Sequence, residues 1–187
     1  MSTRTFSFIG GDTGVWRVVN TEVIVGQALP AAKRLAIVAG SEIPSETPAA
    51  WVLRGITSNE RYTDREERRL IVAELLDLGR PESTRAALIP IRKNEAWWAL
   101  TQEERLSIFK EQSHHTKIGL DHFPTLARRL HHCRDLSENE PFDFITWFEY
   151  MPSEEVAFNN LLAALRAIPE WKYVDREVDI RFEREQA

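Results

Sequence analysis

Cysteine is almost absent from this sequence, since Cys133 is the only one among 187 residues. A single thiol cannot form an intramolecular disulfide, a paired-cysteine zinc site or the two-cysteine motif of covalent cofactor attachment. Long apolar runs are missing too. No stretch approaches the roughly 20 apolar residues of a membrane span, and the N-terminal MSTRTFSFIGGDTGVW has no apolar core of signal-peptide length. We therefore expect a cytoplasmic protein without a membrane partner, in which other side chains hold any cofactor.

An excess of positive charge is also absent. The chain has 24 Lys and Arg against 29 Asp and Glu, a net charge of −5. Such a balance provides no overall field for holding DNA, RNA or an anionic membrane, so we expect no nucleic-acid partner. If the substrate is a small anion, the positive charge that binds it must be local. The 43% of hydrophobic residues, with nine Phe and six Trp, suffices for the core of a globular domain.

Short β-branched and aromatic runs dominate the first part of the chain. Gly, Asp, Asn or Pro separate FSFIG, VWRVV, EVIVG, LAIVAG and WVLRGITS, a pattern typical of strands joined by turns. A helix is expected over 64–78, because Thr63 and Glu66 form a capping-box pattern at its start and Gly79 stands where a helix C-terminus favours glycine.

The second part alternates between the two periodicities. We expect the following elements: a strand at 86–93, a helix from the Thr101/Glu104 capping box to about 121 with Pro124 just beyond it, strands at 126–135 and 142–150, a helix at 154–167 and a strand at 171–182. This order is a β-α-β-β-α-β ferredoxin-like unit, and the first part reads as a reduced copy. The predicted fold class is therefore α+β, a single domain over 1–187. Its halves, approximately 1–93 and 94–187, would form an α+β barrel that can enclose a flat ligand.

All five histidines lie between residues 114 and 132. At 100° per residue, His114 and His115 point to different sides of a helix, and no H-E-x-x-H motif is present, so a shared zinc site is disfavoured. One histidine suffices for haem iron, because the porphyrin supplies four ligands. Arg128 follows His115 by 13 residues, and a turn at Pro124 would bring it back on a strand toward the opposite face of a macrocycle. Spacing alone leaves open that these are surface or structural side chains.

Five segments carry a family resemblance when taken together: GGDTGVW (10–16), LRGITSNERY (53–62), TRAALIPIRKNEAWWALTQEER (84–105), SHHTKIGLDHFPTLARRLHHCRD (113–135) and EPFDFITWFEY (140–150). In order and spacing they resemble the chlorite dismutase family, and more narrowly its short, dimeric lineage. The resemblance implies a homodimeric haem b enzyme with an α+β barrel in each protomer, which converts chlorite to chloride and molecular oxygen.

The resemblance also implies roles for individual residues. His115 matches the axial ligand of the haem iron, and Arg128 matches the catalytic arginine on the open, distal side. Glu170 matches the carboxylate that accepts a hydrogen bond from the axial imidazole. Lys93 matches the lysine associated with it, which could orient Glu170 or pair with a haem propionate. Trp97 and Trp98 match a tryptophan pair near the haem that helps to exclude water.

The sequence leaves rival functions open. One is a coproheme decarboxylase of haem biosynthesis, although those relatives generally lack an arginine at the position of Arg128. Others are a non-enzymatic haem carrier or sensor, and a haem-free barrel whose histidines are structural. Leu75 stands where some short-lineage members carry a glutamine near the distal side, which would leave Arg128 as the sole obvious distal polar group.

Overall fold

The computed structural model describes residues 4–40, 48–57, 61–62, 64–74, 76–122 and 125–185. The strands are β1 (Thr5–Gly11), β2 (Trp16–Val25), β3 (Arg34–Ala39), β4 (Ala49–Ile56), β5 (Arg85–Lys93), β6 (Leu126–His132), β7 (Phe144–Tyr150) and β8 (Val174–Arg184). The helices are α1 (Arg65–Glu74), α2 (Glu95–Ala99), α3 (Gln102–Leu106), α4 (His115–Leu120) and α5 (Glu155–Arg166), with a π-helical turn η1 (Ser107–Gln112) and 3₁₀ turns η3 (Pro152–Glu154) and η4 (Pro169–Tyr173).

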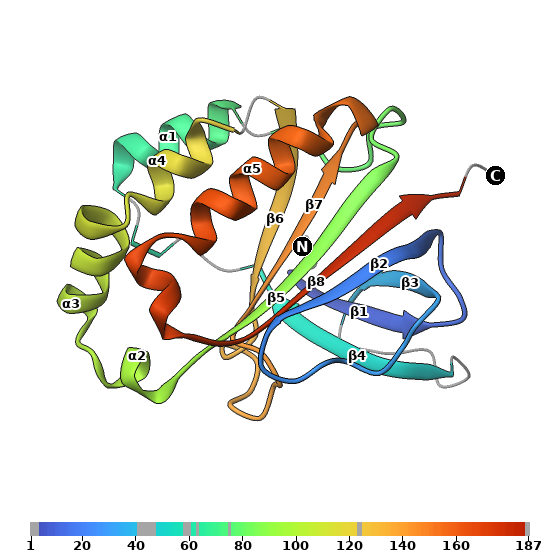
Figure 1. The fold of residues 1–187 in the computed structure, drawn as a ribbon, viewed down its shortest axis with the longest axis horizontal. Coiled ribbons are helices and arrows are strands. Elements are labelled where there is room, and N and C mark those ends of the chain that lie inside the picture. Colours follow the sequence, from blue (N-terminus) through green and yellow to red (C-terminus); the bar gives the residue numbers. More distant parts are fainter. Residues whose placement is uncertain are drawn as a thin grey trace.

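The strands close into an antiparallel barrel in the order β1-β3-β2-β8-β5-β7-β6-β4, which confirms the predicted α+β barrel. The helices gather on one side, over the part of the sheet that contains β5 to β8, and β1 to β4 form the other side (Figure 1). In the described part of the chain, no helix is long and apolar enough to span a bilayer.

Two apolar clusters fill the two sides of the sheet. One lies inside the barrel and contains Phe8, Trp147 and Phe182. The other lies between the sheet and the helix layer, where Phe158 of α5 packs on Phe148 and neighbouring residues. Because successive residues of a strand face opposite sides, strands of the second half contribute to both clusters.

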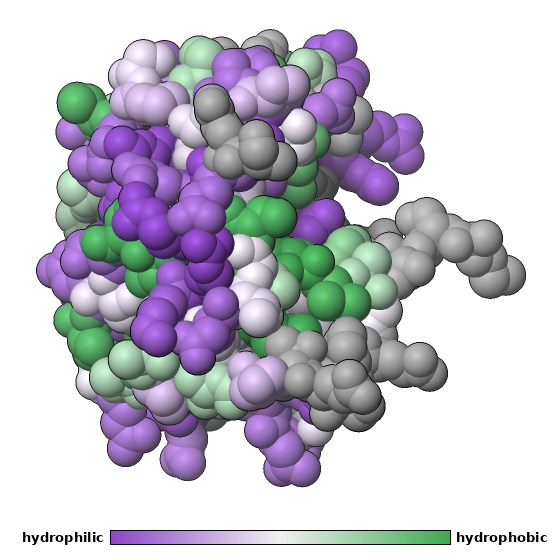
Figure 2. Space-filling view, turned by 90° about the vertical axis from the view of Figure 1, so that its right-hand side faces the viewer, coloured by the Kyte–Doolittle hydropathy of each residue, from purple (hydrophilic) through white to green (hydrophobic). Residues whose placement is uncertain are grey.

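The surface away from the helix layer carries scattered apolar side chains. Figure 2 shows hydrophobic atoms exposed between hydrophilic ones on the face that lies to the right in Figure 1. Several large apolar side chains in or beside β2 are exposed: Val15, Val19, Val23 and Val25. This strand is part of the barrel wall, and no helix lies over it (Figure 1).

The first part of the chain differs from expectation in two ways, at β2 and at Gly79. VWRVV and EVIVG belong to one strand, β2, whose register against β8 shifts twice. Helix α1 starts with reciprocal hydrogen bonds between Asp64 and Glu67, and the predicted capping residue Thr63 lies outside the described residues. Gly79 has φ +83° in a turn after the helix, and its N–H donates to Glu149, so it is not the residue that follows the last helical turn.

The predicted continuous helix over 101–121 is wrong. The Thr101/Glu104 capping box is present, but α3 widens into the π-helical η1 and the helix stops at Ser113. His114 then adopts φ +50°, and α4 starts afresh at His115. A left-handed residue cannot continue a right-handed helix, so the periodicity of the sequence extends across a break that it does not reveal. Pro124 lies outside the described residues.

The remaining elements match their predictions with shifted ends. β6 ends at His132 rather than 135, β7 begins at Phe144 rather than 142, and β8 begins at Val174 because Pro169–Tyr173 form the 3₁₀ turn η4. The short turn η4 has a consequence for the site, because it contains Glu170.

Candidate functional site

Alternate residues of three neighbouring strands line one pocket beneath the helix layer. These residues are Ile89, Ile91 and Lys93 of β5, Phe144, Thr146 and Phe148 of β7, and Arg128, Leu130 and His132 of β6. The helix side contributes Ile71, Phe109, His115, Thr116, Gly119, Leu161, Leu162 and Leu165. The space between the two walls is about 1190 Å³, including open solvent at its mouth. Apart from a few polar side chains, the pocket is lined by aliphatic and aromatic groups, as ligand sites commonly are.

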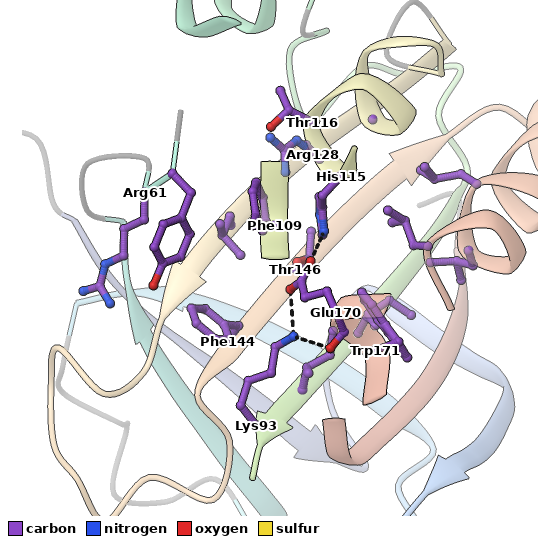
Figure 3. Close-up of a pocket in the computed structure, with 18 of the residues that line it drawn as sticks. Arg61, Lys93, Phe109, His115, Thr116, Arg128, Phe144, Thr146, Glu170 and Trp171 are labelled. Atoms are coloured by element: carbon purple, nitrogen blue, oxygen red, sulfur yellow. Dashed lines mark hydrogen bonds and ion pairs between the residues drawn. The ribbon is translucent and has the colours of Figure 1, made fainter. Parts of the chain in front are cut away.

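His115 enters the pocket from the first turn of α4. Its ring stacks on Phe109 with centroids 4.4 Å apart and planes at 18°. On the other side lies Trp171, 6.3 Å away at 29°. The imidazole Nδ1 is 2.7 Å from Oε2 of Glu170 (Figure 3). These contacts fix the ring plane, and a neutral His115 that donates its Nδ1–H to the carboxylate presents the lone pair of Nε2 for a metal.

Glu170 is buried and held from three directions. Its Oε1 accepts from Nζ of Lys93 at 2.7 Å, its Oε2 lies against His115, and its backbone N–H donates to Oγ of Ser113 at 3.1 Å. The Glu170 and Lys93 side chains are only 6% and 4% exposed. The lysine also lies over the ring of Trp97, with Nζ 4.5 Å from the centroid, so its charge is sheltered by an aromatic face.

The electrostatics keep this buried carboxyl ionised. Burial by itself would raise the pKa of Glu170, but the contacts of its carboxylate with His115 and with the Lys93 ammonium outweigh burial and lower the pKa to about 2. Burial lowers the pKa of the Lys93 ammonium, against the attraction of Glu170. An ionised carboxylate is a strong hydrogen-bond acceptor, so the contact with Glu170 would make the imidazole of His115 more electron-rich.

Arg128 lines the same pocket from the opposite wall, on β6. Its neighbours on that face of the strand are Leu130 and His132, because the residues between them point into the barrel. Its guanidinium keeps its charge at any working pH and offers several N–H donors to an anion. The helix break at His114 and the strand β6 therefore place the imidazole of His115 and the guanidinium of Arg128 on two walls of one apolar space.

Two buried ring nitrogens of pocket-lining residues lack a hydrogen-bond partner within the described part of the chain. They are Nε1 of Trp97 and Nδ1 of His132, in side chains that are 1% and 3% exposed. Burial and the nearby charge of Arg61 lower the pKa of His132 to about 4, so this ring is neutral at pH 7. Buried polar atoms are normally paired, and orphans at a pocket are consistent with a ligand that supplies the missing partners.

Trp98 lies elsewhere. It does not line the pocket with Trp97 but stacks on Phe144, with ring centroids 6.2 Å apart, and donates its indole N–H to Asp143 at 3.3 Å. The guanidinium of Arg134 covers its ring at 4.1 Å. The pocket thus brings together His115, Arg128, Glu170, Lys93 and Trp97 of the sequence-predicted residues. Leu75 lies outside the described residues.

Sequence reasoning missed several residues of the site, namely Arg61, Tyr62, Phe109, His132 and Trp171. His132 could have been found from the period of two that links it to Arg128 on one face of a strand. No local signal identifies Phe109 and Trp171, because their role depends on the helix break and on η4. In the described part of the chain, no cluster of three or more His, Cys, Asp or Glu side chains is arranged to hold a metal ion.

Comparison with known proteins finds similarity to chlorite dismutases. A curated chlorite dismutase from Ideonella dechloratans is 42% identical over 88 residues, which are 47% of this chain and 28% of the length of that relative. The crystal structure of dimeric chlorite dismutases from Nitrobacter winogradskyi has 48% identity and a TM-score of 0.88, covering 96% of this chain and 99% of that one. No family model matches the sequence.

More distant structures share the fold. A mutant chlorite dismutase from Candidatus Nitrospira defluvii has a TM-score of 0.68 at 20% identity, covering 99% of this chain and 92% of that one. At this identity the likeness concerns the barrel and its helix layer.

Proposed function

This chain belongs to the chlorite dismutase family, and on that premise we propose that it is a haem b enzyme that converts chlorite to chloride and molecular oxygen. The observation that carries the proposal is the array His115–Glu170–Lys93 in an apolar pocket that also contains Arg128. The array would hold His115 as an axial ligand of haem iron, and the guanidinium of Arg128 would bind an anionic substrate.

The residues of the pocket fit haem. His115 has its Nδ1 engaged by Glu170 and its Nε2 available, as required of an axial ligand. The aliphatic and aromatic walls suit a macrocycle, and the orphaned Nε1 of Trp97 is a donor that an acceptor on the cofactor would satisfy. When bound, haem would supply a redox-active iron with one coordination position left for the substrate.

The side chains of the pocket would divide the work between binding, orientation and exclusion of water. Glu170 holds the ring of His115 in one orientation and strengthens it as a donor to iron. Lys93 keeps Glu170 ionised and in place. Arg128 would bind chlorite through charge-assisted hydrogen bonds. It would also retain a hypochlorite fragment close to the site until the two oxygen atoms of the chlorite are joined as O₂. The apolar walls strengthen these interactions by excluding water.

The rival functions receive no specific support from the site. A coproheme decarboxylase would have to accommodate extra carboxylates, whereas Ile71, Phe148 and the leucines of α5 give much of the lining an apolar character. A passive haem carrier would need neither Arg128 nor a buried carboxylate behind the ligand. Both features are those expected of chlorite chemistry.

Oxygen release tests the proposal directly. The protein is reconstituted with haem b, chlorite is added, and oxygen is followed with an electrode while chloride is measured by ion chromatography. We expect the amount of oxygen and the amount of chloride each to equal the amount of chlorite consumed, as the atom balance of the reaction demands. Stable haem binding without oxygen release would refute the activity.

We also propose that the protein is a homodimer located in the cytoplasm. The dimeric chlorite dismutases from Nitrobacter winogradskyi support the homodimer, because the two chains correspond over nearly their whole lengths. Light scattering coupled to size exclusion should give about twice the mass of one chain, which is 21.6 kDa. A mass equal to that of one chain at micromolar concentration would contradict it.

A further inference from the structure

Trp171 lies beside both residues that bind the Glu170 carboxylate. Its ring centroid is 5.5 Å from Nζ of Lys93 and 6.3 Å from the centroid of the His115 ring. It also follows Glu170 directly in η4, and both residues line the pocket (Figure 3). The position of Trp171 therefore affects every member of the array.

A second buried carboxylate holds Trp171. The indole Nε1–H donates to Oε2 of Glu177 at 2.8 Å, and Glu177 is fully buried on β8. The other oxygen of Glu177 accepts from Arg166 of α5, at 2.8 Å from Nε and 2.7 Å from a terminal nitrogen. Both carboxylate oxygens are thus used, one toward the site and one toward the helix layer.

Arg166 connects this contact to the rest of the fold. It also pairs with Asp179 at 2.9 Å, two residues further along β8. Glu177 and Asp179 share one face of the strand, because side chains alternate, and α5 covers that face. Glu177 and Asp179, joined by Arg166, form a base on the sheet. Of these residues, Glu177 contacts Trp171.

Turn η4 needs such a base. It is one short 3₁₀ segment, and such turns have poor hydrogen-bond geometry and little stability of their own. The backbone of Glu170 is tied to Ser113, and the indole of Trp171 is tied to Glu177. A small rotation of η4 would carry the Glu170 carboxylate away from His115, and charged hydrogen bonds weaken steeply when they lose alignment.

We propose that Glu177 is a positioning residue of this site, which acts through the Trp171 indole to hold Glu170 against His115. The inference rests on the proposed function in so far as it takes His115 as the axial ligand. Glu177 does not touch the pocket. Its role is to fix the direction in which the buried carboxylate meets the imidazole, and so to set how strongly His115 donates to a bound metal.

Trp171→Phe tests the role with little change in shape, because it removes the N–H and keeps the aromatic ring. In the haem-free protein, we expect the low-field proton resonance of His115 Nδ1–H to move upfield and to exchange faster with water. In the ferrous haem complex, the iron–histidine stretching frequency should fall. The affinity for haem should fall about tenfold, the lower end of the range for outer partners of a metal-binding histidine.

Variants of the two carboxylates give the matched controls. Glu177→Leu should reproduce the changes of Trp171→Phe, whereas Glu177→Gln keeps an acceptor for the indole and should restore most of the His115 signal. Asp179→Asn disturbs the same buried ion network without touching Trp171, so it should lower the unfolding midpoint and leave the His115 resonance unchanged. If Glu177→Leu does not fold, Trp171→Phe and Asp179→Asn still give the comparison.

Two results would overturn the proposal. One is an unchanged His115 resonance, stretching frequency and haem affinity in Trp171→Phe. The other is an equal change in Asp179→Asn, which would show that the network acts only through overall stability. Failure of the proposed function can be distinguished from failure of this inference. Absent oxygen release would refute the activity, whereas the His115 Nδ1–H resonance in the haem-free protein would still test the role of Glu177.

Discussion

His114 and His115 are adjacent residues with opposite surroundings. His114 is exposed and left-handed, whereas the His115 side chain is 25% exposed and bonded to Glu170. The sequence indicates that the two point in different directions, but only the family resemblance selects His115. The resemblance is also what selects Glu170, which lies 55 residues further on and looks like a loop residue.

The first prediction concerns the axial ligand. His115→Ala removes the ring that Glu170 orients, so haem affinity should fall at least about 100-fold. Titration of haem into the protein, followed by the Soret band, measures it. His114→Asn is the matched control, because it changes the neighbouring histidine, tolerates the left-handed conformation and should bind haem normally. Tight binding with an unaltered axial nitrogen signal in His115→Ala would exclude this ligand.

The second prediction concerns the distal arginine. Arg128→Ala should bind haem and keep some turnover, but release hypochlorite and lose activity after fewer turnovers, because the guanidinium that would hold the fragment is gone. A chlorination-sensitive dye measures the escape. Arg128→Lys keeps the charge without the guanidinium fork and should show intermediate leakage. Equal lifetime and no trapped hypochlorite in Arg128→Ala would remove the retention role.

At the scale of elements, the strands and α5 were predictable because their periods of 2 and 3.6 are locally clear. The break between η1 and α4 was not, since every residue from 101 to 121 is compatible with a helix and the interruption depends on tertiary contacts. The same holds for η4, where the contacts of Glu170 and Trp171 override the strand-like alternation of 171–173. These two irregular segments position His115 and Glu170, so the least predictable backbone lies at the candidate site.

The third prediction concerns the break. His114 has φ +50°, a conformation that glycine adopts freely and β-branched residues strongly resist. His114→Ile should lower the free energy of unfolding by about 1–2 kcal/mol and weaken haem binding, because α4 would start in a different direction. His114→Gly should leave both nearly unchanged. Urea unfolding of the two variants measures the difference, and equal stabilities would show that the left-handed residue is not required.

At the scale of the whole molecule, the barrel interior contains a buried titratable group. His131 is fully buried, accepts from Nε of Arg129 at 3.0 Å, and its Nδ1 lies 3.1 Å from the carbonyl oxygen of Ile145. Burial lowers the pKa of His131 from 6.5 to about 4, and that of His132 shifts by the same amount.

The division of the chain into halves at about 93/94 stays a prediction. β5 pairs with both β7 and β8, so the strands of the chain form one closed sheet.

The fourth prediction follows from these pKa values. Between pH 6.5 and 4 the unfolded chain binds protons at His131 and His132 that the folded protein does not, so stability is complete above pH 6.5 and falls as the pH approaches 4. Each residue would contribute up to about 3 kcal/mol. Urea unfolding of the haem-free protein at several pH values measures the slope.

A matched variant isolates one histidine. His131→Gln keeps an acceptor for Arg129 but does not titrate, so its stability should depend less steeply on pH over the same range. An unchanged slope would assign the acid sensitivity to other groups. Glu170 contributes separately at lower pH, because its pKa of about 2 makes its stabilisation disappear only as the pH falls from 4.5 toward 2.

The ring of strands is unevenly joined. Long ladders connect most neighbours, but among the residues that the structure describes β4 meets β6 through one residue pair, Ile56 with His132. Amide protons at this seam should exchange with deuterated solvent much sooner than those of the β5–β7 ladder, because opening it breaks few hydrogen bonds. His132 lines the pocket, so a ligand that contacts His132 would stabilise the pairing of β6 with β4. Binding should then appear as slowed exchange at Ile56, on a strand that contributes no residue to the described lining.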